Sequence, residues 1–259
     1  SPRVHMRVVP VLENYKPKVM WTTGAVTVNN YTDSKAGKKG DFHHTLGFVV
    51  VEIKDKNVFY ARQVTATDKG DFCDLFSEVK GGKVSRVDSV SAVVLGDVHV
   101  GEVDERVEKA TLELLERVKP GATMVHDVFA GTSISHHDAK DPIKQYHKEK
   151  EGTNVLKAEI DNMLEWVGKF YKYNLVVVPA NHNFFLDRWL INADWKHNVK
   201  NAMEYMEFTK VLLEKKAPHG IIAHIIKQKY PKVKTLGHSD SFRVGDWELG
   251  VHGDLGVNG

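Results

Sequence analysis

Apolar residues in the second part of the chain follow two different periods. Continuous, valine-rich runs at residues 91–95, 123–125 and 174–178 are typical of strands that are buried on both faces. Between these runs, apolar residues recur every three or four positions over residues 104–119 and in a stretch that Thr153 opens, which predicts amphipathic helices. The order strand, helix, strand, helix, strand predicts an α/β fold with a largely parallel sheet.

Three more elements are predicted after the third strand. Helical spacing continues over residues 196–216 and 221–229, and residues 242–251 have the pattern of a hairpin that turns at Gly245-Asp246. The 27 residues between the second strand and Thr153 show no clear period, so a long loop is expected there. These elements complete one unit, residues 90–259.

Residues 1–89 have a different character, and we expect a β-rich segment there. Residues 45–53 and 58–65 are rich in β-branched and aromatic side chains and flank a short polar stretch, which predicts a hairpin. Residues 34–41 are rich in glycine and lysine and are predicted to form an exposed loop. Its lysines could contact a nucleic-acid backbone, although a solvated loop explains them equally well.

Composition adds a few constraints. The 259-residue chain has a formal net charge of +2, and its excess of basic residues lies in the first 90 positions, where a polyanion could bind. A single cysteine, Cys73, excludes an internal disulfide framework and suits a reducing cytoplasm. The longest apolar runs are too short to cross a bilayer, so no membrane association is expected.

Polar residues follow each predicted strand at the point where ligands bind in open α/β sheets. Asp97 and His99 follow the first strand, Asp127 the second, Asn181 and His182 the third, and His252 the last hairpin. Each motif alone is more often a turn or a helix cap, but four strand ends would deliver them to one edge. Their mixed oxygen and nitrogen donors suit Mn, Fe, Zn or Mg.

These motifs resemble those of the calcineurin-like metallophosphoesterases, which include nucleases and serine/threonine protein phosphatases. The family pattern is GDxH, GDxxD/N, GNHD/E, a separate His and then GHxH. Gly96-Asp97-x-His99 matches the first motif fully, whereas His126 replaces the glycine of the second and only Asn181-His182 matches the third. The resemblance covers roughly residues 90–259 and implies a sandwich of mixed sheets flanked by helices.

A narrower resemblance covers nearly the whole chain. The strings at residues 22–28, 42–52, 133–137 and 140–142, together with the terminal HGDLGVNG, are similar to phage-encoded calcineurin-like proteins. Those proteins are implicated in DNA degradation or DNA transfer early in infection, which implies DNA as the substrate. Their HGDxGxNG stretch continues toward GHxH, so this chain is expected to be part of a longer protein, truncated before that motif.

The resemblance also implies a role for each matching residue. Asp97 and His99 would bind a first metal ion, Asp127 would bridge two, and Asn181 and His252 would bind the second. The cofactors implied are two divalent metal ions, Mn first, with Fe, Zn or Mg as alternatives. His182 would act as a general acid or as a donor to the transition state.

Three more residues are candidates for substrate binding. His136 and His137 follow the second motif and could position the substrate or Asp127, or could be exposed loop histidines. Arg188 could clamp a phosphate, or could form an ion pair with Asp187 or Asp194.

The favoured function is a metal-dependent DNA nuclease or phosphodiesterase. The alternatives are a phosphomonoesterase or protein phosphatase, and a catalytically incomplete scaffold of the same fold. The phosphatase alternative is weakened because the arginine-bearing GDxxDRG form of the second motif is missing, since Ala130 and Gly131 follow Phe129. The sequence does not determine whether the enzyme acts as an exonuclease or an endonuclease, which strand form it prefers, or whether it forms a homo-oligomer.

Overall fold

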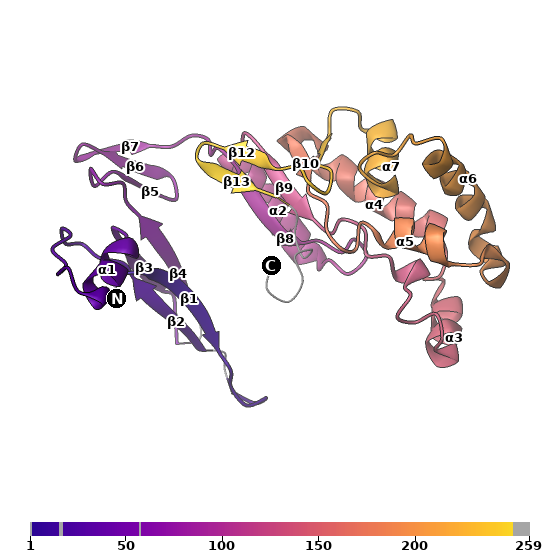
Figure 1. The fold of residues 1–259 in the computed structure, drawn as a ribbon, viewed down its shortest axis with the longest axis horizontal. Helices are drawn as coiled ribbons and strands as arrows, with labels where there is room; N and C mark the ends of the chain where they lie inside the picture. The colour runs from indigo at the N-terminus through magenta and orange to yellow at the C-terminus, as the bar shows by residue number, and fades with distance from the viewer. Residues whose placement is uncertain (1, 16–17, 57, 251–259) are drawn as a thin grey trace. The chain divides into compact units, whose positions relative to one another are not determined.

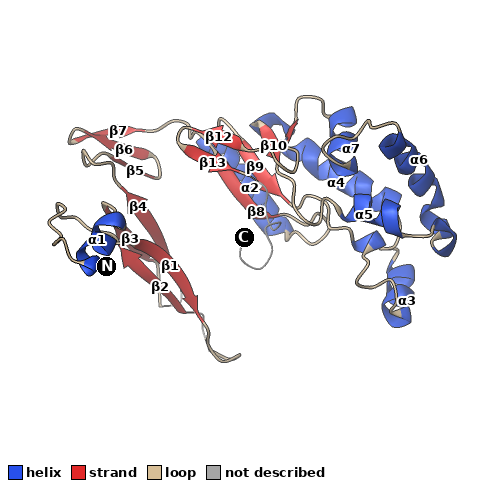
Figure 2. Ribbon diagram, in the orientation of Figure 1, coloured by secondary structure: helices blue, strands red, loops and turns tan. Residues whose placement is uncertain are grey.

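The structure is a computed structural model that describes residues 2–15, 18–56 and 58–250. It divides the chain into two compact units, Ser1–Asp88 and Ser89–Gly259, and each is described here by itself. Figures 1 and 2 label and colour the elements of both units.

The first unit is built from hairpins. Antiparallel pairs join β1 to β2 and β3 to β4, and β5, β6 and β7 form a three-stranded meander. One helix, α1, precedes β3 (Figure 2). The bounds are β1 Val4–Val9, β2 Lys18–Thr23, α1 Lys35–Phe42, β3 Gly47–Ile53, β4 Phe59–Thr65, β5 Phe72–Asp74, β6 Ser77–Lys80 and β7 Lys83–Arg86.

The hairpin predicted from residues 45–53 and 58–65 is confirmed by the β3–β4 ladder, in which Phe48 pairs with Val64. The exposed loop predicted over residues 34–41 is wrong, because this segment forms α1. The Ser34 side chain accepts a hydrogen bond from the Gly37 N–H, which satisfies one of the free donors at the helix N-terminus. The helix forms despite the low helix propensity of its two glycines, Gly37 and Gly40.

The second unit is organised around a parallel sheet in the order β11-β10-β9-β8. Its strands are β8 Val93–Asp97, β9 Thr123–His126, β10 Leu175–Val177 and β11 Lys234–Thr235. Helix α2 (Glu105–Val118) connects β8 to β9, and α4 (Leu156–Phe170) lies on the path from β9 to β10. The predicted α/β class and parallel strand order are confirmed.

Alternate residues of the strands pack on opposite faces of this sheet, as the period of two requires. Val125 and Val177 belong to a large core with residues of α2, α4, α5 (Phe185–Asn192) and α7 (Ile221–Lys229). Met124 and Val176 belong to a smaller core that Phe242 and Leu249 cover. The sheet therefore has helices on one face and the hairpin of β12 (Phe242–Val244) and β13 (Trp247–Leu249) on the other (Figure 1).

Three predictions in this unit need correction. The long loop expected after β9 contains a 3-10 turn, η1 (Thr132–Ile134), and helix α3 (Pro142–Glu151), which Asp141 caps. The single helix expected over residues 196–216 is broken into the 3-10 turns η3 (Trp195–His197) and η4 (Val199–Asn201) and helix α6 (Ala202–Leu213). Another 3-10 turn, η2 (Tyr171–Tyr173), follows α4.

The break before α6 places Asn201 where it can cap helix α4. Thr153 was expected to open α4, but α4 begins at Leu156, whose N–H donates to the side-chain oxygen of Asn201 at 2.8 Å. Asn201 is fully buried and lies at the end of η4, so the turn places a remote cap on α4. Among the described residues, no helix is both long and apolar enough to cross a membrane.

Candidate metal centre

The carboxyl ends of β8 and β9 bring three candidate ligands together. Asp97 ends β8, His99 follows two residues later, and Asp127 comes directly after β9. One ligand atom from each of these side chains lies within 4.8 Å of the other two. Two carboxylates and one imidazole form a donor set that suits Mn, Fe, Zn or Mg, so the residues present fit a divalent cation.

The backbone at this cluster is unusual. His99 and Asp127 both lie in the left-handed region, with φ angles of 45° and 46°. Residues other than glycine rarely adopt this backbone conformation, although Asp and His tolerate it better than most. The His99 N–H donates to the Asp127 carbonyl at 2.8 Å, which ties the two turns together. Backbone strain of this kind, roughly 1–3 kcal/mol per residue, concentrates at functional sites.

His182 is fixed beside this cluster by three contacts. Its backbone N–H donates to Asp127 Oδ1 at 3.2 Å, and its Nδ1 lies 2.8 Å from the Ala130 carbonyl oxygen. Because a carbonyl can only accept, Nδ1 carries the hydrogen and Nε2 is left for other chemistry. The His182 ring packs edge-on against His99, with ring centroids 4.3 Å apart.

Phe185 supports His182 from its other side. The two rings are stacked with centroids 4.3 Å apart, and the Arg188 guanidinium lies 4.8 Å from the centre of the Phe185 ring. Arg188 also donates to the Asn181 carbonyl oxygen at 2.6 Å. Neither of the acids proposed as its ion-pair partner is used, so the contacts of Arg188 tie α5 to the loop that carries Asn181.

His136 and His137 lie next to Phe185. Their rings are 3.9 Å apart, and the His136 ring meets Phe185 at 5.2 Å. Desolvation, with smaller contributions from His137 and Arg188, lowers the pKa of His136. His136 therefore favours its neutral form in the folded protein, and its ring contacts the same Phe185 on which His182 stacks.

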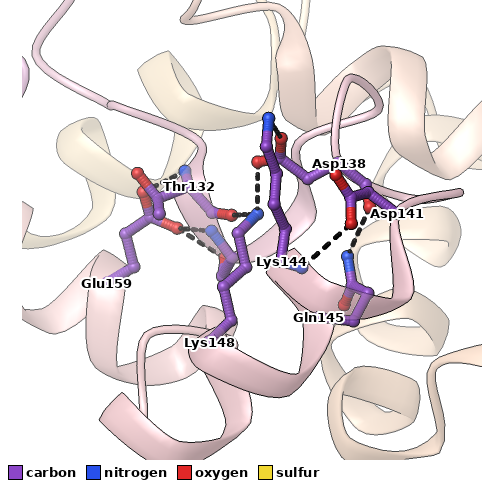
Figure 3. A network of polar contacts seen from close by, with 8 residues as sticks. Thr132, Asp138, Asp141, Lys144, Gln145, Lys148 and Glu159 are labelled. Atoms are coloured by element: carbon purple, nitrogen blue, oxygen red, sulfur yellow. Dashed lines mark hydrogen bonds and ion pairs between the residues drawn. The ribbon is translucent and has the colours of Figure 1, made fainter.

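A polar network holds the segment that carries these histidines (Figure 3). The Glu159 carboxylate accepts from the Thr132 and Ser133 N–H groups at 2.8 and 2.9 Å. Lys148 donates to the Thr132 carbonyl oxygen and pairs with Asp138 at 2.8 Å, and Lys144 pairs with the same carboxylate. These contacts anchor η1 and the following turn on α3 and α4, which also fixes the Ala130 carbonyl.

Two predicted ligands, Asn181 and His252, remain besides the cluster of three. Asn181 is exposed and follows β10, next to His182. His252 lies outside the described residues. Asp127, by contrast, is 2% exposed, so its charge is buried beside the other two ligands. A buried carboxylate needs a counter-charge, and a cation at this cluster would supply one.

Sequence reasoning missed the residues that hold the site in place. Phe185 is one of them, and its signal in the sequence is a large apolar residue three positions after His182, at the start of a helix. Glu159 and Lys148 gave no such signal, because their partners, Thr132 and Asp138, lie 27 and 10 residues away and are set by the fold.

Comparison with known proteins gives one informative similarity. The chain is 30% identical over 273 aligned residues to Protein A1 of Escherichia phage T5. The alignment covers 97% of this chain and 49% of the phage protein, so the chain spans about half the length of that relative. The similarity to a phage protein therefore includes both units.

Two other comparisons return nothing. No protein-family model matches the chain, and no solved structure matches it. The metallophosphoesterase resemblance thus remains a prediction from the motifs, beside a parallel α/β sheet and a cluster of Asp97, His99 and Asp127 that could bind a metal.

Proposed function

We propose that this chain is a calcineurin-like metallophosphoesterase that hydrolyses phosphodiester bonds in DNA. The observation that carries the proposal is the cluster of Asp97, His99 and Asp127 at adjacent strand ends, with donor atoms within 4.8 Å of one another. His182 lies against this cluster with its Nε2 unused by the Ala130 contact. The similarity to a phage protein over nearly the whole chain is compatible with a phage nuclease.

Asp97, His99 and Asp127 would hold one divalent cation, and Asp127 with Asn181 and His252 would hold a second. Manganese is the first choice, and a bound pair of such cations polarises a phosphoryl oxygen and lowers the pKa of water. Asp127 is suited to the shared position because one of its oxygens is already fixed by the His182 N–H. This contact also fixes the orientation of Asp127 Oδ2, the second oxygen of the carboxylate.

His182 would complete the reaction as a proton donor. Hydrolysis forms a bond from a water oxygen to phosphorus and breaks the bond to the departing sugar oxygen, which needs a proton. The Ala130 carbonyl holds Nδ1–H, so a protonated His182 can donate from Nε2. The stack on Phe185 keeps the ring in this orientation.

The test is manganese binding, measured by calorimetry, together with hydrolysis of bis(4-nitrophenyl) phosphate and plasmid DNA. Asp127→Asn is expected to lower both hydrolysis rates by more than about 100-fold, because it removes the shared charge. His136→Ala and His137→Ala should cost less, about 10–100-fold, as for residues that act through others. His147→Ala, an exposed histidine on α3, is the matched control and should change neither.

Two results would contradict the proposal. A wild-type chain that binds no manganese would remove its basis. Faster hydrolysis of 4-nitrophenyl phosphate than of the diester would instead favour a phosphomonoesterase.

A further inference from the structure

A cavity of about 900 Å³, open on one side, lies in the second unit, and Phe185, which stacks on His182, is part of its lining. It is enclosed by the segment from η1 to α3, by α5 and by the turns η3 and η4. The residues that matter for its chemistry are His136, Lys140, Phe185, Arg188, Trp189 and Lys200.

Aromatic contacts connect the lining of the cavity to the candidate metal ligands. Phe185 lines the cavity and is stacked on His182, which in turn packs against His99. Arg188 lines it as well and donates to the carbonyl oxygen of Asn181. A polymer with one phosphate at the metal centre could therefore extend its next residue into this cavity.

The charges in the cavity are distributed unevenly. Lys200 is paired with Glu149 at 2.6 Å, which neutralises the side near η4. Arg188 and Lys140 form no ion pair within residues 2–15, 18–56 and 58–250. Asp194 also lines the cavity, where it accepts from the Lys196 N–H and lies 4.0 Å from His197. Arg188 and Lys140 can therefore accept an anion such as the phosphate of a nucleic-acid backbone, away from this carboxylate.

An aromatic side chain completes the site. Trp189 is half-buried on the cavity wall, and Tyr205 packs against it with ring centroids 5.2 Å apart. The Tyr205 hydroxyl is fixed by the carbonyl oxygens of Leu190 and Ala193. A tryptophan held in this way is a platform on which a base can stack.

We propose that this cavity binds an unpaired nucleotide next to the scissile phosphate, with its base on Trp189 and its phosphate near Arg188 and Lys140. The substrate would then be single-stranded DNA, which deepens and rests on the proposed phosphodiesterase function. The volume lies near the upper end of roughly 300–1,000 Å³ for ligand clefts and cavities, enough for a nucleotide. An intact duplex offers no unpaired base, and extruding one costs free energy.

The experiment measures binding first and hydrolysis second. Binding of a fluorescent single-stranded oligonucleotide and of its duplex is followed by anisotropy in EDTA, where no metal contributes. Hydrolysis of the same strand and of bis(4-nitrophenyl) phosphate is then measured with manganese. The variants are Trp189→Ala, Trp189→Phe and, as a matched control, Trp247→Ala, which changes an exposed tryptophan of β13.

Wild-type protein should bind the single strand more tightly than the duplex. Trp189→Ala should weaken that binding about 5- to 100-fold, the usual contribution of one stacked base. Trp189→Phe should restore most of it, and Trp247→Ala should have no effect. The loss of hydrolysis caused by Trp189→Ala should be at least fivefold larger for the strand than for the small diester.

Equal affinity for strand and duplex, no detectable strand binding, or equal effects of Trp189→Ala and Trp247→Ala would overturn the inference. Failure of the proposed function looks different. In that case the wild-type chain would hydrolyse neither the strand nor the small diester, whatever the binding in EDTA shows.

Discussion

In residues 2–88, apolar side chains lie mainly on the outside of paired strands, whereas residues 89–250 bury theirs between a parallel sheet and its helices. Val64 is the one buried apolar side chain in the described part of the first unit. The second unit has a continuous core to which α2, α4, α5 and α7 all contribute. The first unit is held mainly by ladder hydrogen bonds, and isolated hairpins are only marginally stable.

This difference explains where a functional site can form. Catalytic groups need support from rigid elements, because a misplacement of about 1 Å is costly. Asp127 follows the buried strand β9, and β8, which leads to Asp97 and His99, pairs with β9, so the core supports this cluster from one side. The first unit has no comparable support for its side chains within its described residues.

The largest expected effect comes from breaking the core of the second unit. Phe170 is 1% exposed and stacks on Trp166, with ring centroids 4.0 Å apart. Phe170→Ala should lower the free energy of unfolding by about 3–5 kcal/mol, because it removes buried contacts and leaves a cavity. Urea unfolding followed by circular dichroism measures this change.

The control is Phe59→Ala in the first unit, where the side chain is 58% exposed. This variant should cost less than about 1 kcal/mol. Similar losses in the two variants would mean that the first unit has a core of its own, and the comparison would fail.

A smaller effect is expected where α4 holds the segment after β9. Glu159→Gln keeps the shape of the side chain but weakens charge-assisted hydrogen bonds to the Thr132 and Ser133 N–H groups. The free energy of unfolding should fall by about 1–2 kcal/mol. Glu151→Gln on the exposed end of α3 is the control and should stay within about 0.5 kcal/mol. An unchanged Glu159→Gln protein would show that η1 is held by other contacts.

The smallest expected effect on stability appears only at acidic pH. Hydrogen bonds from Lys144, then from Lys148, lower the pKa of Asp138 to about 2. A depressed carboxyl pKa stabilises the fold above the unfolded value of about 3.9, and this contribution is lost as the pH falls toward 2. The Tm of the wild type should therefore fall between about pH 4 and pH 2 more steeply than that of Asp138→Asn. Parallel curves for the two proteins would exclude Asp138 as a cause.

Local patterns predicted most of the second unit because its elements are determined by nearby residues. The helix over residues 104–119 was predicted from apolar spacing and a cap, and Asp104 does accept from the Arg106 N–H at 2.8 Å. The parallel order followed from alternating strands and helices. The β3–β4 hairpin likewise follows from β-branched side chains around a short polar turn.

The errors arise where distant residues decide the structure. Asn201 caps α4 from 45 positions away, so neither the start of α4 nor the break before α6 could be predicted from local spacing. The motifs predicted the grouping of Asp97, His99 and Asp127, since strand ends in a parallel sheet share an edge. They could not predict the stack of Phe185 on His182, nor the cavity behind it, because both depend on how α5 packs.

The left-handed backbone at His99 and Asp127 limits which residues these two positions can accept. Glutamate at position 127 would keep the negative charge but would fit the left-handed turn poorly, whereas asparagine would fit the turn and lose the charge. Each substitution thus satisfies one requirement at the expense of the other. Main-chain conformation and side-chain chemistry select the same few amino acids, so a stepwise mutational route away from this cluster passes through proteins that are impaired in folding or in binding.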